Sequence, residues 1–249
     1  MLVLLFSLLS HYLSLFPSTF STNYLLLTVF MIITHFGGEF IKVQFGDVVF
    51  AFNPPSRDSK LKTARFGADI ALISANHPDF NGVDIVTHGD HRPFVISGPG
   101  EYEIRGIVVR GFATESDYGT DGKSKRINTV YTVALEGMKL CFLGALSSGE
   151  LPDVLKEELD EIDILFIPIG SIGVLSPSSA NKLAVALEPR LVIPIHFAGI
   201  GDKNALKQFL KESGEENSSS SGRALDKLTL KKKDLEGKEG EVVVLAASF

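Results

Sequence analysis

The sequence predicts an α/β fold of the layered α+β kind, in which two β-sheets pack face to face and helices cover their outer faces. Two observations predict it. Short strand patterns bounded by turn residues follow one another from residue 32 to residue 143, and helix and strand patterns then alternate up to residue 211. The composition agrees, because 45% hydrophobic and 22% charged residues is the balance of a globular domain.

Strands are expected where apolar and β-branched residues run or alternate between turn signals. Residues 40–45 and 48–52 form a hairpin that turns at Gly46 and Asp47, since pairs of this type favour tight turns. Residues 70–74 are apolar on both faces, which is typical of a strand in the middle of a covered sheet. The remaining strands of this half are expected at residues 32–34, 94–96, 102–104, 107–112, 128–135 and 139–143.

Helices alternate with strands after residue 150. Ser176 is placed to cap a helix over residues 176–187, Pro177 suits its first turn, and Glu188-Pro189 ends it. Three lysines, residues 231–233, fall on an expected strand and indicate a solvated edge. The other elements are expected at 151–159 and 204–211 as helices and at 164–168, 191–195, 227–232 and 241–245 as strands, with a serine-rich loop at 215–224.

Residues 1–30 differ from the rest of the chain, because the first charged side chain is Glu39. Pro17 and its polar neighbours divide this apolar stretch into two pieces, each shorter than the roughly 20 residues that a membrane-spanning helix needs. Three interpretations stay open: an extension upstream of a native start at Met31, a membrane tether, or a cleaved signal segment that lacks a basic start. Residues 31–249 are expected to form one acidic domain.

Charge and cysteine content exclude several classes of protein. A net charge of −6 gives no basis for nucleic-acid binding. One cysteine, Cys141, excludes an internal disulfide framework and any CxxC motif, so a metal would have to be held by histidines and carboxylates. These features favour a cytoplasmic protein with a small-molecule or protein partner. Membrane attachment or export would require residues 1–30, and the oligomeric state is left open.

Seven short strings follow one another along the chain: ITHFGGEF, ADIALISANHPDFN, FVISGPGEYEIRGI, KRINTVYTV, LCFLGALS, IDILFIPIG and LEPRLVIPIHF. In this order they resemble the metallo-β-lactamase superfamily, in particular its small, single-domain branch of metal-dependent hydrolases. The resemblance covers about residues 32–197. It implies an αββα sandwich whose site lies at one edge, between the two sheets, on the loops that follow the strands.

Active members of that superfamily carry a His-x-His-x-Asp-His motif after the buried strand. Closely spaced imidazoles and a carboxylate can hold one or two Zn²⁺-type ions there and lower the pKa of a bound water. The equivalent stretch in this chain is ANHPDF, residues 75–80. His77 and Asp79 stand at the second His and the Asp, whereas Ala75 and Phe80 replace the first and last His.

The other ligand positions implied by the resemblance are mostly changed. Ser116 stands near the position of a later His, and Ala145 replaces the bridging Asp of a Leu-Gly-Asp string. Asn53 replaces an acidic residue that usually precedes a Pro, whereas the final His is kept as His196. Among these expected metal-ligand positions, His77, Asp79 and His196 therefore look intact.

These losses predict a degenerate metal site, since Ala and Phe offer no lone pair to an ion. We expect a protein without a cofactor, non-catalytic or weakly active, that binds a small molecule or a protein. The alternative is a hydrolase of an ester, lactone or phosphoester that uses hydroxide on a single Zn²⁺, Mn²⁺ or Fe²⁺. His77 and His196 would hold this ion, with Asp79, His35 or Asp117 recruited.

Asp79 has two interpretations. It is a candidate catalytic general base if one ion binds, and it is equally placed to cap a helix that follows. Arg126 and Asn128 are expected to fix the loop that carries Ser116 and Asp117, because loop residues near a site are usually structural. Whether the chain is an enzyme stays open at this point.

Overall fold

A computed structural model of the chain describes residues 30–122, 124–215 and 224–248. The expected N-terminal extension lies outside the described residues except for Phe30, which leads into the first strand. No helix of the described part is both long and apolar enough to cross a bilayer.

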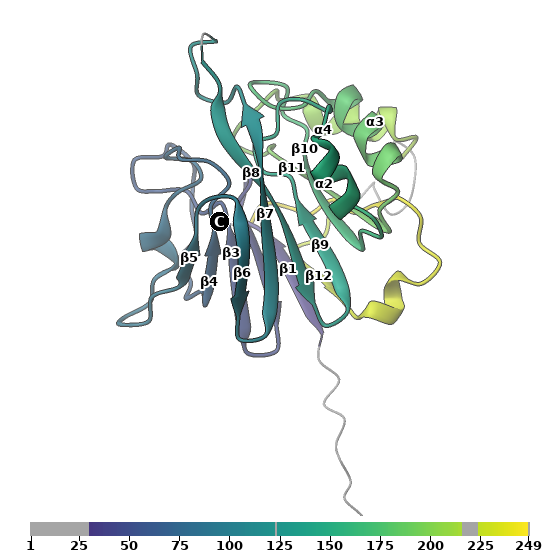
Figure 1. The fold of residues 1–249 in the computed structure, drawn as a ribbon. Helices are drawn as coiled ribbons and strands as arrows, with labels where there is room; N and C mark the ends of the chain where they lie inside the picture. Colours follow the sequence, from purple (N-terminus) through teal and green to yellow (C-terminus); the bar gives the residue numbers. More distant parts are fainter. Residues whose placement is uncertain (1–29, 123, 216–223, 249) are drawn as a thin grey trace, which may run out of the picture.

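The first of two sheets has six strands in the order β12-β1-β2-β3-β4-β5 (Figure 1). Its β1, β2 and β3 are antiparallel neighbours, whereas β3, β4 and β5 run parallel. The strands are β1 (Met31–His35), β2 (Ile41–Phe45), β3 (Val48–Phe52), β4 (Ile70–Leu72), β5 (Phe94–Ile96) and β12 (Leu228–Leu230).

The second sheet has seven strands in the order β13-β11-β10-β9-β8-β7-β6. Its β6 to β9 are antiparallel, and β9, β10, β11 and β13 are parallel. The strands are β6 (Gly100–Ile104), β7 (Ile107–Ser116), β8 (Arg126–Leu135), β9 (Met138–Phe142), β10 (Ile164–Pro168), β11 (Leu191–Ile195) and β13 (Glu241–Val242).

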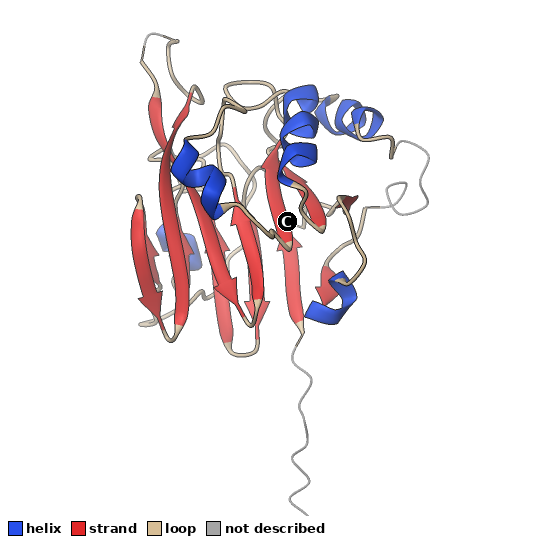
Figure 2. Ribbon diagram, turned by 45° about the vertical axis from the view of Figure 1, so that its right-hand side comes forward, coloured by secondary structure: helices blue, strands red, loops and turns tan. Residues whose placement is uncertain are grey.

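In the part of the chain that the structure describes, three α-helices cover the outer face of the seven-stranded sheet (Figure 2). They are α2 (Asp153–Glu158), α3 (Pro177–Leu187) and α4 (Ala205–Glu212), and two short 3₁₀ helices are η1 (Val83–Val86) and η2 (Lys232–Leu235). The expected start of α3 is confirmed, because the Ser176 hydroxyl accepts a hydrogen bond from the Ser179 amide and Pro177 occupies the first turn. A cap of this kind stabilises a helix by about 1 kcal/mol.

The prediction of two packed sheets is confirmed, and so are most of the expected strands. The prediction of three lysines on a strand is wrong. β12 ends at Leu230. Lys231 is the N-cap of η2, where its amide hydrogen is accepted by the Asp234 carboxylate, so the lysines belong to a 3₁₀ helix and not to a strand. The β7–β8 hairpin is longer than predicted, because pairing continues outward to Ser116 and Arg126.

The main core lies between the two sheets, and a second core lies between the seven-stranded sheet and the helices. Several strands of both sheets end at the same edge of the sandwich. The turn after β1 meets the end of β11 there, where the His196 amide donates to the Gly38 carbonyl at 2.7 Å. Side chains that follow these strands are therefore brought together, as is usual at the carboxyl ends of parallel strands.

Candidate functional site

The site begins with a buried carboxylate and a buried imidazole. Glu39 follows the turn after β1 and His196 follows β11, and both side chains are fully buried. The Nδ1 atom of His196 lies 2.5 Å from Oε1 of Glu39. The Nε2 atom of His196 is buried and has no hydrogen-bond partner. A carboxylate that orients one ring nitrogen leaves the other nitrogen facing the site.

A polar network behind Glu39 fixes its position. The Asn53 amide donates to Oε2 of Glu39 at 2.6 Å and to the Ser74 hydroxyl at 2.7 Å. The Ser74 amide donates back to Oδ1 of Asn53 at 2.7 Å. Asn53 and Ser74 follow β3 and β4, so the network connects the ends of two adjacent strands with β1 and β11. Buried polar groups in such a network are satisfied, which holds the Glu39 carboxylate in place.

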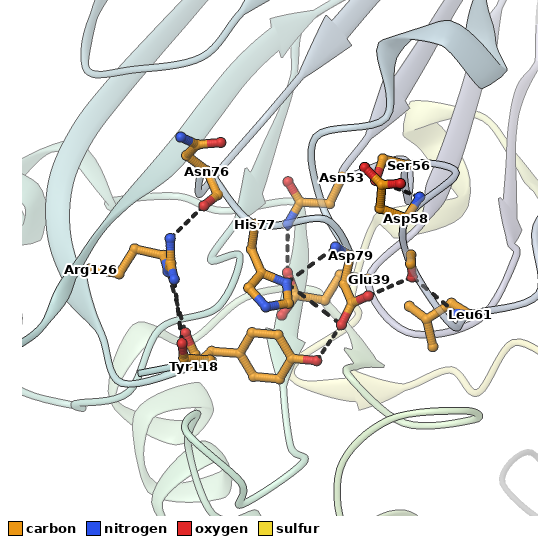
Figure 3. A network of polar contacts seen from close by, with 12 residues as sticks. Glu39, Asn53, Ser56, Asp58, Leu61, Asn76, His77, Asp79, Tyr118 and Arg126 are labelled. Atoms are coloured by element: carbon orange, nitrogen blue, oxygen red, sulfur yellow. Dashed lines mark hydrogen bonds and ion pairs between the residues drawn. The ribbon is translucent and has the colours of Figure 1, made fainter. Parts of the chain in front are cut away.

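His77 and Asp79 lie in the loop that follows β4 (Figure 3). Nδ1 of His77 accepts a hydrogen bond from the Asp79 amide at 3.2 Å. In a neutral imidazole the proton then resides on Nε2. That atom faces Gly119, where an added Cβ would lie 2.6 Å away. Both Asp79 oxygens are engaged, because Oδ1 accepts from the Ser59 hydroxyl at 2.5 Å and Oδ2 accepts from the Tyr118 hydroxyl at 2.6 Å.

The Tyr118 ring lies between the two candidate histidines. Its centroid is 4.9 Å from that of His77 and 4.9 Å from that of His196, with edge-to-face geometry at both. Figure 3 shows the ring reaching under His77 with its hydroxyl directed at Asp79. Edge-to-face contacts of this kind are attractive by about 0.5–1.5 kcal/mol each. Tyr118 thus connects all three candidate ligands, His77, Asp79 and His196.

Residues at three of the positions where the resemblance implies metal ligands form an apolar cluster. Ala75, Phe80 and Ala145 are buried together with Val174, and Tyr118 and Ile200 pack against them. The Phe80 ring lies 5.0 Å from the Tyr118 ring and 6.2 Å from the His196 ring. Hydrocarbon therefore fills the space beside the candidate ligands, and such packing excludes water from it.

Arg126 holds the loop that follows Ser116 and Asp117, as expected from the sequence, whereas Asn128 holds the turn after β9. The Arg126 guanidinium donates to the Asn76 carbonyl at 2.5 Å and, at 3.4 Å, to the carbonyls of Tyr118 and Gly119. The Asn128 amide donates to the Leu143 carbonyl and accepts from the Ala145 amide at 3.0 Å. These contacts connect the hairpin loop to the loop after β4 and to the turn after β9.

Burial shifts the pKa of two groups in the cluster. The pKa of the His77 imidazole is lowered, chiefly because burial disfavours its charged form, although the nearby Asp79 carboxylate opposes the shift. The pKa of the Tyr118 hydroxyl is raised, first by burial and then by its hydrogen bond to Asp79. Both shifts favour the neutral side chain, so Tyr118 remains a hydrogen-bond donor to Asp79 near neutral pH.

The structure brings His77, Asp79 and His196 around one ring, and it places the other candidates elsewhere. His35 lies beneath the turn after β1, with its ring nitrogens 3.3 Å from the Leu245 carbonyl and 3.2 Å from the Gly38 carbonyl. The Asp117 backbone carbonyl accepts from the Thr120 hydroxyl, and no contact joins the Asp117 carboxylate to the candidate ligands. The helix-cap interpretation of Asp79 is wrong, because η1 has Gly82 at its N-cap and no side-chain cap.

Sequence reasoning missed Glu39, Tyr118 and Ser59. Glu39 carried a signal, since it is the first charged residue of the chain and directly precedes the apolar start of a strand. Glu39 directly follows the Gly37-Gly38 turn and makes its contact with His196 from there. Tyr118 and Ser59 lie in loops whose paths no local pattern specifies.

Most of the candidate metal-ligand atoms are already engaged in hydrogen bonds. The lone pair of His77 Nδ1 is used by a backbone amide, and both Asp79 oxygens accept hydrogen bonds from hydroxyls. Among the described residues, no group of three or more His, Cys, Asp or Glu side chains has the placement to hold an ion. The Nε2 atom of His196 is left as one unengaged nitrogen donor, whereas catalytic zinc sites usually have three protein ligands.

Comparison with known proteins places this fold in a family. The model of the β-lactamase superfamily domain matches residues 33–196. A UPF0173 metal-dependent hydrolase of Thermococcus onnurineus is 32% identical over 158 residues, which is 55% of this chain and 70% of the relative. Another of Bacillus licheniformis is 26% identical over 198 residues, which is 68% of this chain and 86% of the relative.

A solved structure agrees with the sequence relatives. It is a Thermotoga maritima protein assigned as a Zn-dependent hydrolase of the metallo-β-lactamase superfamily. It superposes with a TM-score of 0.65 at 26% identity and covers 86% of this chain and 98% of its own. The chain therefore belongs to the metallo-β-lactamase superfamily and, within it, to the UPF0173 family of metal-dependent hydrolases.

Proposed function

We propose that this chain is a binding member of its family, in which aromatic and apolar side chains replace the dinuclear metal site. One observation carries the proposal: the Tyr118 ring lies against both candidate histidines and its hydroxyl occupies one Asp79 oxygen. An ion would need the Asp79 oxygen that the Tyr118 hydroxyl engages and the space beside both histidines that the Tyr118 ring fills, so binding it would break a packed cluster.

The chemistry of the replaced positions supports the same proposal. Two ions need a bridging carboxylate and several imidazoles, and the buried side chains of Ala75, Phe80 and Ala145 provide neither. The Glu39–His196 pair remains as a buried polar group beside this apolar cluster. A fixed polar group of this kind gives orientation and specificity to ligand binding.

A second candidate function is hydrolysis through one Zn²⁺, Mn²⁺ or Fe²⁺. The unpartnered Nε2 atom of His196 favours it, because a buried polar atom without a partner is rare and usually has a functional reason. In this case His77 and Asp79 would join His196 as ligands of the ion only after the Tyr118 side chain had moved. Asp79 would then act as general base in place of its hydrogen bond to Tyr118.

Metal analysis of the full chain, purified without a chelating tag and exposed to each of the three ions, separates the two functions. The binding function predicts less than about 0.1 equivalent of bound metal after desalting, in the wild type and in His77→Ala alike. About one equivalent that is lost in His77→Ala would establish the mononuclear hydrolase. About two equivalents would refute both, because two ions need more ligands than three. The double variant His88→Ala/His91→Ala, which removes two exposed imidazoles, is the matched control.

A further inference from the structure

A cavity of about 430 Å³ lies at the edge of the sandwich beside the candidate site. It is lined by Gly37, Lys60, Leu61, Lys62, Ala198 and Gly199. Two of the six lining residues are basic and none is acidic, although the whole chain has a net charge of −6. Its volume falls within the range of roughly 300–1,000 Å³ typical of small-molecule sites.

The loop that carries the two lysines is fixed at both sides of the cavity. The Leu61 side chain packs on two glycine turns, where an added Cβ at Gly38 would lie 3.1 Å from it and one at Gly199 would lie 3.2 Å from it. Leu61 also donates its amide hydrogen to the Ser59 hydroxyl, which in turn donates to Asp79. Lys60 and Lys62 flank this anchor, and both line the cavity.

The cavity floor offers further donors. Gly37 is buried and Gly199 is exposed, and within the described part of the chain the amide N–H of neither one donates to an acceptor. A buried amide without an acceptor is rare in proteins. The cavity floor is also connected to the candidate site. Gly38 follows Gly37, and its carbonyl accepts the amide hydrogen of His196 at 2.7 Å.

The surrounding charge favours an anion here. Residues 56–66 carry four basic side chains and one acidic side chain. A larger cavity of about 1,050 Å³ beside α2 and α3 has the opposite character. Acidic side chains predominate in its lining, because six carboxylates stand against three basic side chains: Glu157, Asp160, Glu161, Glu188, Glu236 and Glu239 against Lys156, Arg190 and Lys238. The field of the protein therefore directs an anion to the smaller cavity and away from the larger one.

We infer that the cavity between Lys60, Lys62 and the two glycine turns binds the phosphate group of a small phosphate monoester. Lysine side chains in the lining supply positive charge for a phosphate dianion, and the amide N–H groups of Gly37 and Gly199 can donate to its oxygens. The rest of the molecule would extend toward the His196 side of the floor. This inference rests on the proposed binding function, because it names the ligand class of that site.

Calorimetric titration of the full chain with inorganic phosphate, glycerol 2-phosphate, acetate and a short oligonucleotide, at constant ionic strength, tests the inference. We expect saturable binding of both phosphates, about tenfold weaker binding of acetate, and about tenfold weaker phosphate binding by Lys60→Ala/Lys62→Ala. The control Lys182→Ala/Lys207→Ala removes the same charge from exposed positions on α3 and α4 and should bind phosphate as the wild type does.

Three results would overturn the inference. They are the absence of saturable phosphate binding, an equal loss of affinity in both double variants, and binding of an oligonucleotide that is far tighter than that of glycerol 2-phosphate. Metal content is measured on the same preparations. Stoichiometric metal together with lysine-dependent phosphate binding would refute the binding function and support the phosphate site. Metal-free protein that does not bind phosphate would refute the phosphate site and leave the binding function standing.

Discussion

Substitution of Tyr118 by Phe tests the role of its hydroxyl at the centre of the site. The change removes the 2.6 Å hydrogen bond to Asp79 and leaves the ring in its contacts with His77 and His196. A hydrogen bond to a charged group contributes about 1.5–3 kcal/mol. Asp79 keeps its bond to Ser59 and is 15% exposed, so water can replace the lost donor. We therefore expect a loss of about 1.5 kcal/mol, at the lower end of that range.

For a domain of 150–250 residues this loss lowers Tm by about 3–6 °C. Unfolding is followed by circular dichroism, since the chain has no tryptophan. Tyr102→Phe is the matched control, because its hydroxyl donates only to backbone carbonyls at 3.2 and 3.4 Å. In a double-mutant cycle with Asp79→Ala, the coupling energy should reach at least about 1 kcal/mol. An unchanged Tm in Tyr118→Phe, or a coupling energy near zero, would refute the assigned interaction.

Three further predictions concern the same region. Gly119→Ala should destabilise the fold by about 1–3 kcal/mol more than Gly122→Ala in urea unfolding, because both have positive φ but only the first places a Cβ against His77. His196→Ala should cost about 3–5 kcal/mol, measured the same way, since it leaves a buried carboxylate without its partner. Burial lowers the pKa of His35, so the unfolded state takes up a proton first as the pH falls through about 6.5, and stability decreases. In His35→Leu the loss of unfolding free energy between about pH 7.5 and 5.5 should be smaller than in the wild type; an equal loss would contradict this account.

The fold could be predicted from the sequence because most elements carry a local signal. The hairpin of β2 and β3 turns at Gly46, whose φ is +57°, and α3 begins at a serine cap followed by proline. The strand ends were harder to predict. Ser116 and Arg126 are polar, and they extend the β7–β8 hairpin only because each has a partner on the opposite strand. Pairing over distance overrides local preference in such strands.

The candidate site could be predicted only in part. The resemblance located His77, Asp79 and His196, and the structure places all three side chains around Tyr118. It could not show which atoms these side chains engage. The hydroxyl of Ser59 reaches Asp79 across 20 residues, and the carboxylate of Glu39 reaches His196 across 157 residues. Contacts of this range depend on how loops pack and leave no periodic pattern in the sequence.

Backbone conformation argues that the site is more than a filled core. His196 has a φ of +61°, Ala198 has +55° and Asn53 has +43°, and all three follow strands at the same edge of the sandwich. A left-handed conformation costs a residue with a side chain roughly 1–2 kcal/mol. An apolar core needs no such strain, since Leu or Val in extended conformations fill space equally well. The Glu39 hydrogen bond and the Gly38 carbonyl hold His196 in this conformation, which keeps its ring edge-to-face with the Tyr118 ring and leaves its Nε2 atom without a partner. Strain that the surroundings maintain at one place in a fold points to function there, and here it favours a ligand that uses His196.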